Sequence, residues 1–470
     1  MIGILGIVLA LALLMVLAYR GVSVLILAPL MALLAVLFSP GTPLLASYTQ
    51  VFMPALGGFV IAFFPLFLLG AVFGKLMEAS GAALAIAHAI VERLGAERAI
   101  LAIVLACAVL TYGGVSLFVV AFAVYPIAAA LFRQAQLPKR LIPGAIALGA
   151  FTFTMTALPG TPAIQNAIPM PYFGTTPFAA PGLGLIAGLI MLVLGVWWLT
   201  RRAAAAARAG EGYGAHDEDP VTIRPTSPTS SSHPPQPGGF GRAIAPVVLV
   251  IALNYLLATW VLPALDTAYL AEARYGGTHI NAVRGIWAVI VALAASIVLL
   301  IVLQRRQLHE LTGTLEQGAA GSVLPLLNTA SLVGFGAVIA SLAGFALVRD
   351  AVLGIAPGNP LVSLSIAVNI LAGITGSASG GMSIALQTLG ETWLAMGQAA
   401  GIAPDLLHRV TAIATGGLDA LPHNGAVITL LSICGLSHRQ AYLDIFVVAV
   451  AIPLLSLVAV VVLGTLFGSF

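Results

Sequence analysis

Four short polar segments interrupt otherwise apolar sequence, and their side chains are of the kind that bind small polar molecules. The segments are TYGGVS (111–116), ALPGTPAIQN (157–166), TGSASGGMS (375–383) and GGLDALPHNG (416–425). Hydroxyl and amide groups dominate them: Thr111, Ser116, Thr161, Gln165, Asn166, Thr375, Ser377, Ser379, Ser383 and Asn424. Such donors and acceptors suit a polyol or a hydroxy-acid. Alternatively, these small residues only pack helices closely and cap their ends.

Asp419 and His423 add titratable groups to the fourth segment, four residues apart. A carboxylate at the centre of a bilayer costs roughly 2.5–3.5 kcal/mol on insertion scales, so such a residue usually faces a cavity and has a function. We therefore assign ion coupling to both residues. Asp419 is a candidate to carry a proton or bind Na+, and His423 to titrate near neutrality or contact the substrate. The alternative is that the two side chains pair with each other and stabilise the break.

None of the four segments contains Lys or Arg. An anionic substrate would therefore be held by backbone and hydroxyl dipoles, which suits a small monocarboxylate better than a citrate-like trianion. Cys107 and Cys434 lie in apolar runs without metal-ligand spacing, and we interpret them as small buried hydrophobic residues. We predict no metal and no cofactor, only H+ or Na+ as a coupling ion.

Composition places the surroundings of these segments in lipid. Only 7% of the 470 residues are charged, whereas 60% are hydrophobic. Soluble domains average roughly 25% charged residues, and so few charges cannot cover the surface of a water-soluble fold of this size. The fold class predicted is an all-α polytopic membrane protein. The net charge of +3 is loop Lys and Arg, so no nucleic-acid partner is expected.

Ten stretches have about the length and apolarity of a membrane span. They are 2–19, 22–39, 55–77, 141–168, 181–200, 244–264, 284–304, 322–348, 405–436 and 441–468. Two of them, 141–168 and 405–436, contain polar segments and are predicted to be broken helices. The stretches 99–133 and 360–397 are broken at their centres, and their short arms favour re-entrant hairpins.

Basic residues indicate the orientation of the chain. With Arg20 in the cytoplasm, all of the 19 Lys and Arg residues except Arg274, Arg284, Arg349 and Arg409 fall on the cytoplasmic side. Residues 201–243 are rich in Pro, Ser, Gly and Thr, and we predict a flexible cytoplasmic linker there. This linker separates the segment 1–200 from 244–470.

The two halves carry matching motifs in the same order. Gly113-Gly114-Val115-Ser116 corresponds to Gly380-Gly381-Met382-Ser383, and Ala157-Leu158-Pro159 to Ala420-Leu421-Pro422. The predicted spans and their orientation give two repeats of opposite topology, each with five transmembrane helices and one re-entrant hairpin. Inverted repeats with discontinuous helices are typical of secondary transporters that bind substrate near the bilayer midplane. Non-helical backbone survives in a membrane only where protein or a water-filled cavity covers it, so the four segments are expected to converge on one site.

The sequences ALPGTPAI (157–164), GSASGGMSIAL (376–386) and GGLDALPHNGAVITLLSICGLSHRQAY (416–442) resemble the gluconate:proton symporter family of permeases, and most closely its hydroxybutyrate-permease-like branch. The resemblance covers nearly the whole chain except the linker. It implies a bacterial inner-membrane, multi-pass protein of the ion transporter superfamily, whose members are typically homodimers. It also implies an elevator mechanism, with 99–133, 141–200 and 350–470 as the transport domain and the remainder as the scaffold.

The resemblance also implies contact residues. Hairpin-tip contacts with substrate fall on Gly113, Gly114, Ser116, Ser377, Ser379 and Ser383, with Gly380 and Gly381 in the same tip, and broken-helix contacts fall on Thr161, His423 and Asn424. The chain departs from the sugar-acid permeases, which carry a Pro-Pro-His-Pro-Gly-Pro-like stretch where this chain has Leu158-Pro159-Gly160-Thr161-Pro162. In the second broken helix their His-x-Asn-Asp-like stretch is replaced by Pro422-His423-Asn424-Gly425. The simpler site fits a smaller acid such as 3-hydroxybutyrate better than gluconate.

The function predicted is import of a small hydroxy-monocarboxylate by symport with H+ or Na+. A cation/proton antiporter without an organic substrate is the main alternative, but it predicts paired acidic residues and only Asp419 is evident. An intramembrane enzyme using Asp419 and His423 lacks an HExxH motif, a catalytic Asp pair and a nucleophile elbow. The duplicated halves disfavour a channel. The partners expected are a small organic anion, the lipid bilayer and a second copy of the chain.

Overall fold

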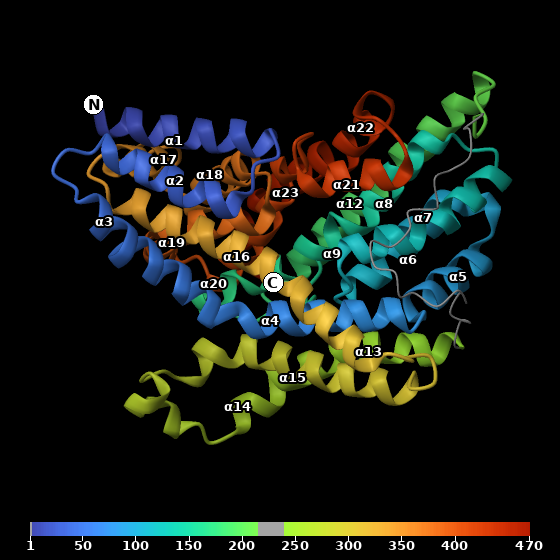
Figure 1. The fold of residues 1–470 in the computed structure, drawn as a ribbon, viewed down its shortest axis with the longest axis horizontal. Helices are drawn as coiled ribbons and strands as arrows, with labels where there is room; N and C mark the ends of the chain where they lie inside the picture. The colour runs from blue at the N-terminus through green and yellow to red at the C-terminus, as the bar shows by residue number, and fades with distance from the viewer. Residues whose placement is uncertain (1, 215–238) are drawn as a thin grey trace.

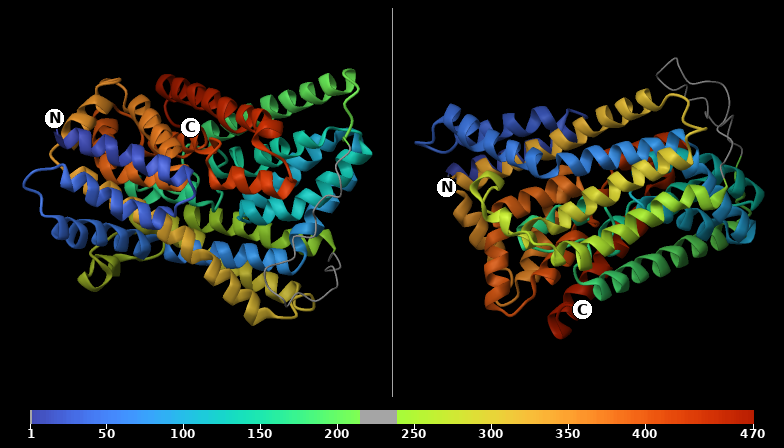
Figure 2. Two further views of the ribbon diagram at one scale, coloured as in Figure 1. Left: turned by 45° about the horizontal axis from the view of Figure 1, so that its top comes forward. Right: turned by 90° about the horizontal axis from the view of Figure 1, so that it is seen from below.

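The computed structural model describes residues 2–214 and 239–470, and within these ranges all regular secondary structure is helical (Figure 1). The predicted all-α class is therefore confirmed. The long helices lie roughly parallel in the right-hand view of Figure 2. Seven of the described helices are long and apolar enough to cross a membrane, and an eighth candidate is the pair Ala82–Leu94 and Ala96–Tyr112, bent by 103°.

One set of helices packs around two long central ones. Its members are α1 (Ile2–Tyr19), α2 (Val24–Leu37), α3 (Leu44–Ala46), α4 (Met53–Ala79), α13 (Phe240–Leu256), α14 (Leu262–Ala264), α15 (Ile280–Leu303), α16 (Leu311–Ser341) and α17 (Phe345–Leu353). Among the described helices, α4 and α16 share the most extensive contact. Helix α2 packs on α16, whereas α15 packs on α4 and brings α13 with it. In Figure 1, α13 and α15 lie along the lower side.

A second set contains the elements that carry the four polar segments. In the first half these are α5 (Ala82–Leu94), α6 (Ala99–Tyr112), α7 (Leu117–Gln134), α8 (Ile142–Ala150), α9 (Phe153–Thr156), α10 (Ile164–Ala167), α11 (Pro169–Phe173) and α12 (Pro181–Arg208). In the second half they are α18 (Pro360–Thr375), α19 (Ala378–Ala399), α20 (Pro404–Thr415), α21 (Gly425–Cys434), α22 (His438–Phe446) and α23 (Ile452–Phe467). Helices α6 and α7 pack against each other, as do α18 and α19.

Three of the long apolar helices contain a π-helical turn just before a proline. The turns are Ser47–Phe52, Leu257–Val261 and Val447–Ala451, and each is followed two residues later by proline. A proline ring clashes with the carbonyl one turn earlier, and a wider turn relieves that clash without ending the helix. The apolar runs 44–79, 240–264 and 438–467 therefore continue as single spans.

The predicted linker is wrong at both ends. Residues 201–208 continue α12, because the sequence RRAAAAAR has high helix propensity, and α13 begins at Phe240. The stretch 209–214 is also placed, since Glu211 binds Arg140 through two hydrogen bonds of 2.7 and 2.9 Å. The rest of the predicted linker, 215–238, lies outside the described residues.

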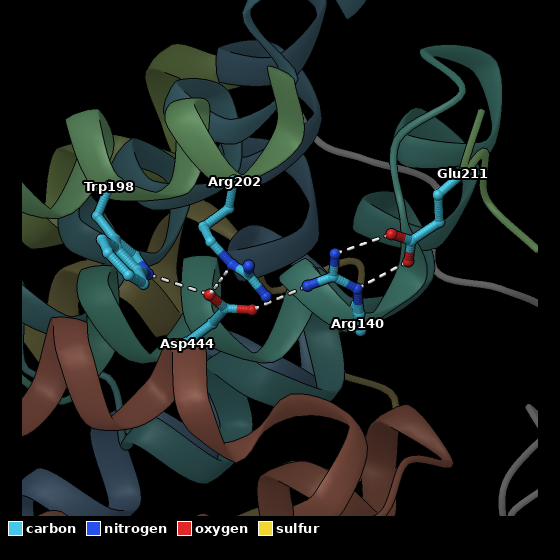
Figure 3. A network of polar contacts seen from close by, with 5 residues as sticks. All are labelled: Arg140, Trp198, Arg202, Glu211 and Asp444. Atoms are coloured by element: carbon cyan, nitrogen blue, oxygen red, sulfur yellow. Dashed lines mark hydrogen bonds and ion pairs between the residues drawn. The ribbon is translucent and has the colours of Figure 1, made fainter. Parts of the chain in front are cut away.

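A polar network joins the start of α8 to α12 and α22 (Figure 3). The carboxylate of Asp444, 1% exposed, accepts hydrogen bonds from Arg202 Nε at 3.0 Å, Trp198 Nε1 at 3.0 Å and Arg140 at 3.3 Å. The Asp444 carboxylate therefore lies inside the protein. Hydrogen bonds from Arg140 hold the pKa of Glu211 below its usual range, and the Glu211 carboxylate raises the pKa of Arg140.

Candidate functional site

All four polar segments border one cavity of about 620 Å³. The tip between α6 and α7 contributes Gly114 and Ser116, and the tip between α18 and α19 contributes Ser377 and Ser379. The two broken helices contribute Gln165 from the first and Asp419 and Asn424 from the second. Leu66 and Phe67 of α4 and residues 321–329 of α16 complete the wall. The structure thus brings together segments that lie more than 300 residues apart in the sequence.

The first hairpin tip turns at a glycine. Gly114 has φ +93°, a left-handed conformation that favours glycine, and a Cβ there would lie 2.9 Å from Pro162 in the first broken helix. Ser116 then begins α7. Gly113 does not line the cavity; a Cβ at that position would lie 2.5 Å from Val247 of α13. Gly113, predicted to contact the substrate, therefore packs closely against α13 instead.

Side chains from other helices donate hydrogen bonds to the backbone carbonyls at the break of the first broken helix. Tyr112 Oη donates to Pro159 O at 2.6 Å, and Asn254 Nδ2 donates to Gly160 O at 3.1 Å. Thr161, 1% exposed, accepts from the Ala163 amide at 3.3 Å and does not line the cavity. These bonds fix the start of α10, and the next turn places Gln165 at the cavity.

The second hairpin tip holds its hydroxyl groups close together. Ser377 accepts from the Gly380 amide at 3.1 Å, and its Oγ lies 3.4 Å from Ser379 Oγ. Gly380 and Gly381 do not line the cavity. A Cβ on Gly380 would clash with Leu332 of α16, and one on Gly381 would clash with the backbone amide of Ala372. Ser383 is fully buried away from the cavity as well.

The second broken helix is tied to the second hairpin. Asn424 Nδ2 donates to Gly376 O at 2.9 Å and to Asp419 O at 2.7 Å, while its Oδ1 accepts from the amides of Ala426 and Val427. Although Asn424 borders the cavity, its donors and acceptors are all used within the protein. His423 does not border the cavity, and its Nε2 lies 2.9 Å from Gly373 O. The geometry therefore gives both residues a positioning role.

Asp419 is the one ionisable side chain among the described residues that line the cavity. Within the described part of the chain, Asp419 forms no ion pair, so the pairing with His423 that the sequence allowed is not formed. A carboxyl group that faces a cavity without a fixed cation can bind a proton or a metal cation. Among the described residues, no cluster of three His, Cys, Asp or Glu side chains has the geometry of a metal site.

Sequence reasoning missed the contribution of α16. Ser322, Asn328 and Thr329 line the cavity from this helix, and Thr329 Oγ1 lies 3.3 Å from Ser379 Oγ. The helix is regular through these positions, so no break marked them. A signal was nevertheless present, because Pro325 and several polar residues occur within an apolar span.

A buried arginine lies behind the first broken helix. Arg409, 0% exposed, donates to Ala179 O at 2.9 Å, Pro177 O at 3.2 Å and Asn166 Oδ1 at 3.1 Å. His408 lies 3.2 Å from the same Asn166 oxygen. Asn166 is thus used within the protein and does not face the cavity. Arg409, one of the four basic residues not assigned to the cytoplasmic side, helps to hold the first broken helix in place.

Comparison with known proteins identifies relatives along the full chain. The chain is 46% identical over 468 residues to the uncharacterized transporter YxjC of Bacillus subtilis (strain 168), and the match covers 98% of both sequences. Its fold is similar to the crystal structure of the Alcanivorax borkumensis YdaH transporter, described as having an unusual topology, with a TM-score of 0.55 and 17% identity over 88% of this chain and 87% of that one. No family model matches.

Proposed function

The chain belongs to the family of membrane transporters that includes YxjC, and from this premise we propose that it imports a small hydroxy-monocarboxylate by symport with H+ or Na+. It is a multi-pass membrane transporter and not an enzyme. The observation that carries the proposal is the cavity shared by all four polar segments. Discontinuous helices that converge in this way are how secondary transporters build a substrate site.

Three helix N-termini make the cavity suitable for an anion. Ser116, Ser377 and Asn424 occupy the N-cap positions of α7, α19 and α21, which have 18, 22 and 10 residues, and all three border the cavity. The start of a helix carries partial positive charge. The first amides of α7 have no side-chain cap, whereas Ser377 caps one amide of α19 and Asn424 caps two of α21. Since no Lys or Arg among the described residues lines the cavity, these dipoles would hold one carboxylate but not three. The volume of about 620 Å³ leaves room for a short acid.

Asp419 supports cation coupling. Its carboxyl group borders the same cavity and has no ion-pair partner among the described residues, so a bound H+ or Na+ would neutralise it while the substrate carboxylate binds nearby. Both charges would then cross the membrane together. His423, which contacts Gly373 O, would couple this event to the second hairpin.

The order of elements supports a duplication. In the first half, the hairpin α6–α7, the broken helix α8–α11 and α12 follow one another, and α18–α19, α20–α21 and α22–α23 repeat that order. Each hairpin glycine with positive φ also packs on its own broken helix: a Cβ on Gly114 would meet Pro162, and one on Gly376 would meet His423. On this basis the segments 1–200 and 244–470 form inverted repeats, with α4 and α16 in an elevator scaffold of a homodimer in the bacterial inner membrane.

Uptake into proteoliposomes tests the proposal. Purified protein is expected to accumulate labelled 3-hydroxybutyrate when a pH or Na+ gradient is imposed, and gluconate more weakly. Failure of every short hydroxy-acid to accumulate under either gradient contradicts it. The antiporter alternative, which the unpaired Asp419 would also serve, predicts Na+/H+ exchange in liposomes that contain no organic acid.

A further inference from the structure

Three buried polar atoms at the cavity have no hydrogen-bond partner in the described part of the chain. They are Oγ1 of Thr111 at the end of α6, Oε1 of Gln165 on α10 and Oδ1 of Asn328 on α16. The side chains of Thr111 and Gln165 are only 3% and 7% exposed. Leaving buried polar groups unpaired is unfavourable, and these three belong to residues that line the cavity, where a ligand would complete them.

Other hydroxyl groups at the same cavity are satisfied by the protein. Thr156 donates to Thr152 O at 3.2 Å, Thr329 to Pro325 O at 3.1 Å and Ser322 to Ala319 O at 2.6 Å. A helical threonine or serine usually bonds a carbonyl of the preceding turn in this way. Thr111 is helical but makes no such bond among the described residues, which leaves its buried hydroxyl without a partner in that part of the protein.

We propose that Thr111, Gln165 and Asn328 form a subsite for the hydroxyl group of the substrate, an inference that rests on the proposed function. The two amide side chains can present either oxygen or nitrogen, and a hydroxyl can pair with either because it both donates and accepts. The carboxylate of the same molecule would lie at the N-termini of α7 and α19, whose N-cap residues Ser116 and Ser377 border the same cavity. Asn328 adds a contact from outside the four polar segments.

The subsite predicts selection for a hydroxylated acid over its deoxy analogue. A site built to hydrogen-bond a hydroxyl rejects an analogue that lacks it, by as much as about 10⁴-fold, because the protein groups are then left unpaired. For three neutral groups we expect 3-hydroxybutyrate to bind roughly 100-fold more tightly than butyrate.

The test measures competition against labelled 3-hydroxybutyrate exchange in proteoliposomes, with unlabelled 3-hydroxybutyrate and butyrate as competitors. Gln165→Met, which keeps the side-chain length, should weaken 3-hydroxybutyrate about tenfold or more and leave butyrate nearly unchanged. Gln387→Met is the matched control, since Gln387 is exposed on α19 and does not line the cavity.

Thr111→Val provides a second, independent arm of the test. Thr388→Val is its control, because the Thr388 hydroxyl donates to Ile384 O at 2.8 Å and the residue does not line the cavity. Both cavity variants should lower the ratio of the two affinities, and both controls should keep it. If the cavity variants weaken the binding of 3-hydroxybutyrate and butyrate equally, the subsite is overturned. It is also overturned if the Na+ or H+ dependence of exchange changes while the ratio of the two affinities stays the same, since that result would indicate a cation at this position. If the wild-type protein neither binds nor exchanges 3-hydroxybutyrate, the proposed function itself fails and the subsite fails with it.

Discussion

The side-chain amide of Asn424 donates to the carbonyl oxygen of Gly376 at 2.9 Å, and this bond joins the second broken helix to the tip of the second hairpin. The same side chain caps α21 through Oδ1 and reaches back to Asp419 O. One residue therefore holds three parts of the cavity wall in register. The relative placement of Ser377 and Asp419 depends on it.

Replacing Asn424 should affect both stability and transport. Asn424→Ala removes the cap of α21 and leaves two carbonyls unpaired, so we expect a loss of roughly 2–3 kcal/mol in the free energy of unfolding and at least tenfold slower uptake. Thermal unfolding and proteoliposome uptake measure the two effects. Asn359→Ala is the matched control, since Asn359 caps α18 and does not line the cavity; it should cost about 1 kcal/mol and leave uptake intact. Equal effects of the two variants on uptake would argue against the positioning role.

Asp419→Asn should separate coupling from binding. The amide can still hydrogen-bond in the cavity but cannot exchange a proton or carry a negative charge, so gradient-driven accumulation should be lost while exchange of labelled for unlabelled substrate continues. Asp350→Asn is the control, because Asp350 is exposed beside Arg349. If Asp419→Asn accumulates substrate as well as the wild type does, Asp419 has only a structural role.

Asp444→Asn should destabilise the protein without changing substrate selectivity. The buried carboxylate receives bonds from Arg140, Arg202 and Trp198, and its loss leaves Arg202 without its counter-charge, whereas Arg140 keeps that of Glu211. Because the arginine side chains are 22% and 31% exposed, we expect about 2 kcal/mol, less than for a fully buried pair. Thermal unfolding in detergent measures the change. If the melting temperature of Asp444→Asn equals that of the wild type, the polar network around Asp444 does not stabilise the protein.

The Arg140–Glu211 pair predicts a pH dependence limited to acid conditions. The pKa of Glu211 is lowered from its ordinary value of 4.5 by hydrogen bonds from Arg140, so its contribution is fully present above that value and is lost as the pH falls through the lowered pKa. The difference in stability between the wild type and Glu211→Gln should therefore be constant from pH 6 to 8 and vanish only in acid. A difference that changes between pH 6 and 8 would exclude this assignment.

The sequence predicts the position of the cavity better than its individual contacts. Proline and glycine inside apolar runs mark non-helical backbone in a membrane, which is why all four segments are found at the cavity. Which residue of a tip faces the cavity depends on the neighbouring helices: Gly113 packs on Val247, whereas Gly114 borders the cavity. Asn328 escapes the sequence pattern because it lies on an unbroken helix. The boundary at 201 is misplaced because the Pro, Ser, Gly and Thr content of 201–243 as a whole favours a linker, although the alanines at its start favour helix.

A cryo-EM map of the protein in lipid nanodiscs with saturating 3-hydroxybutyrate is the most direct test of the central claim. The account predicts one ligand-sized density between Ser116, Gln165, Ser377 and Asp419, absent from a map without the acid. A ligand density outside this cavity, or a cavity filled by side chains in both maps, would contradict the account.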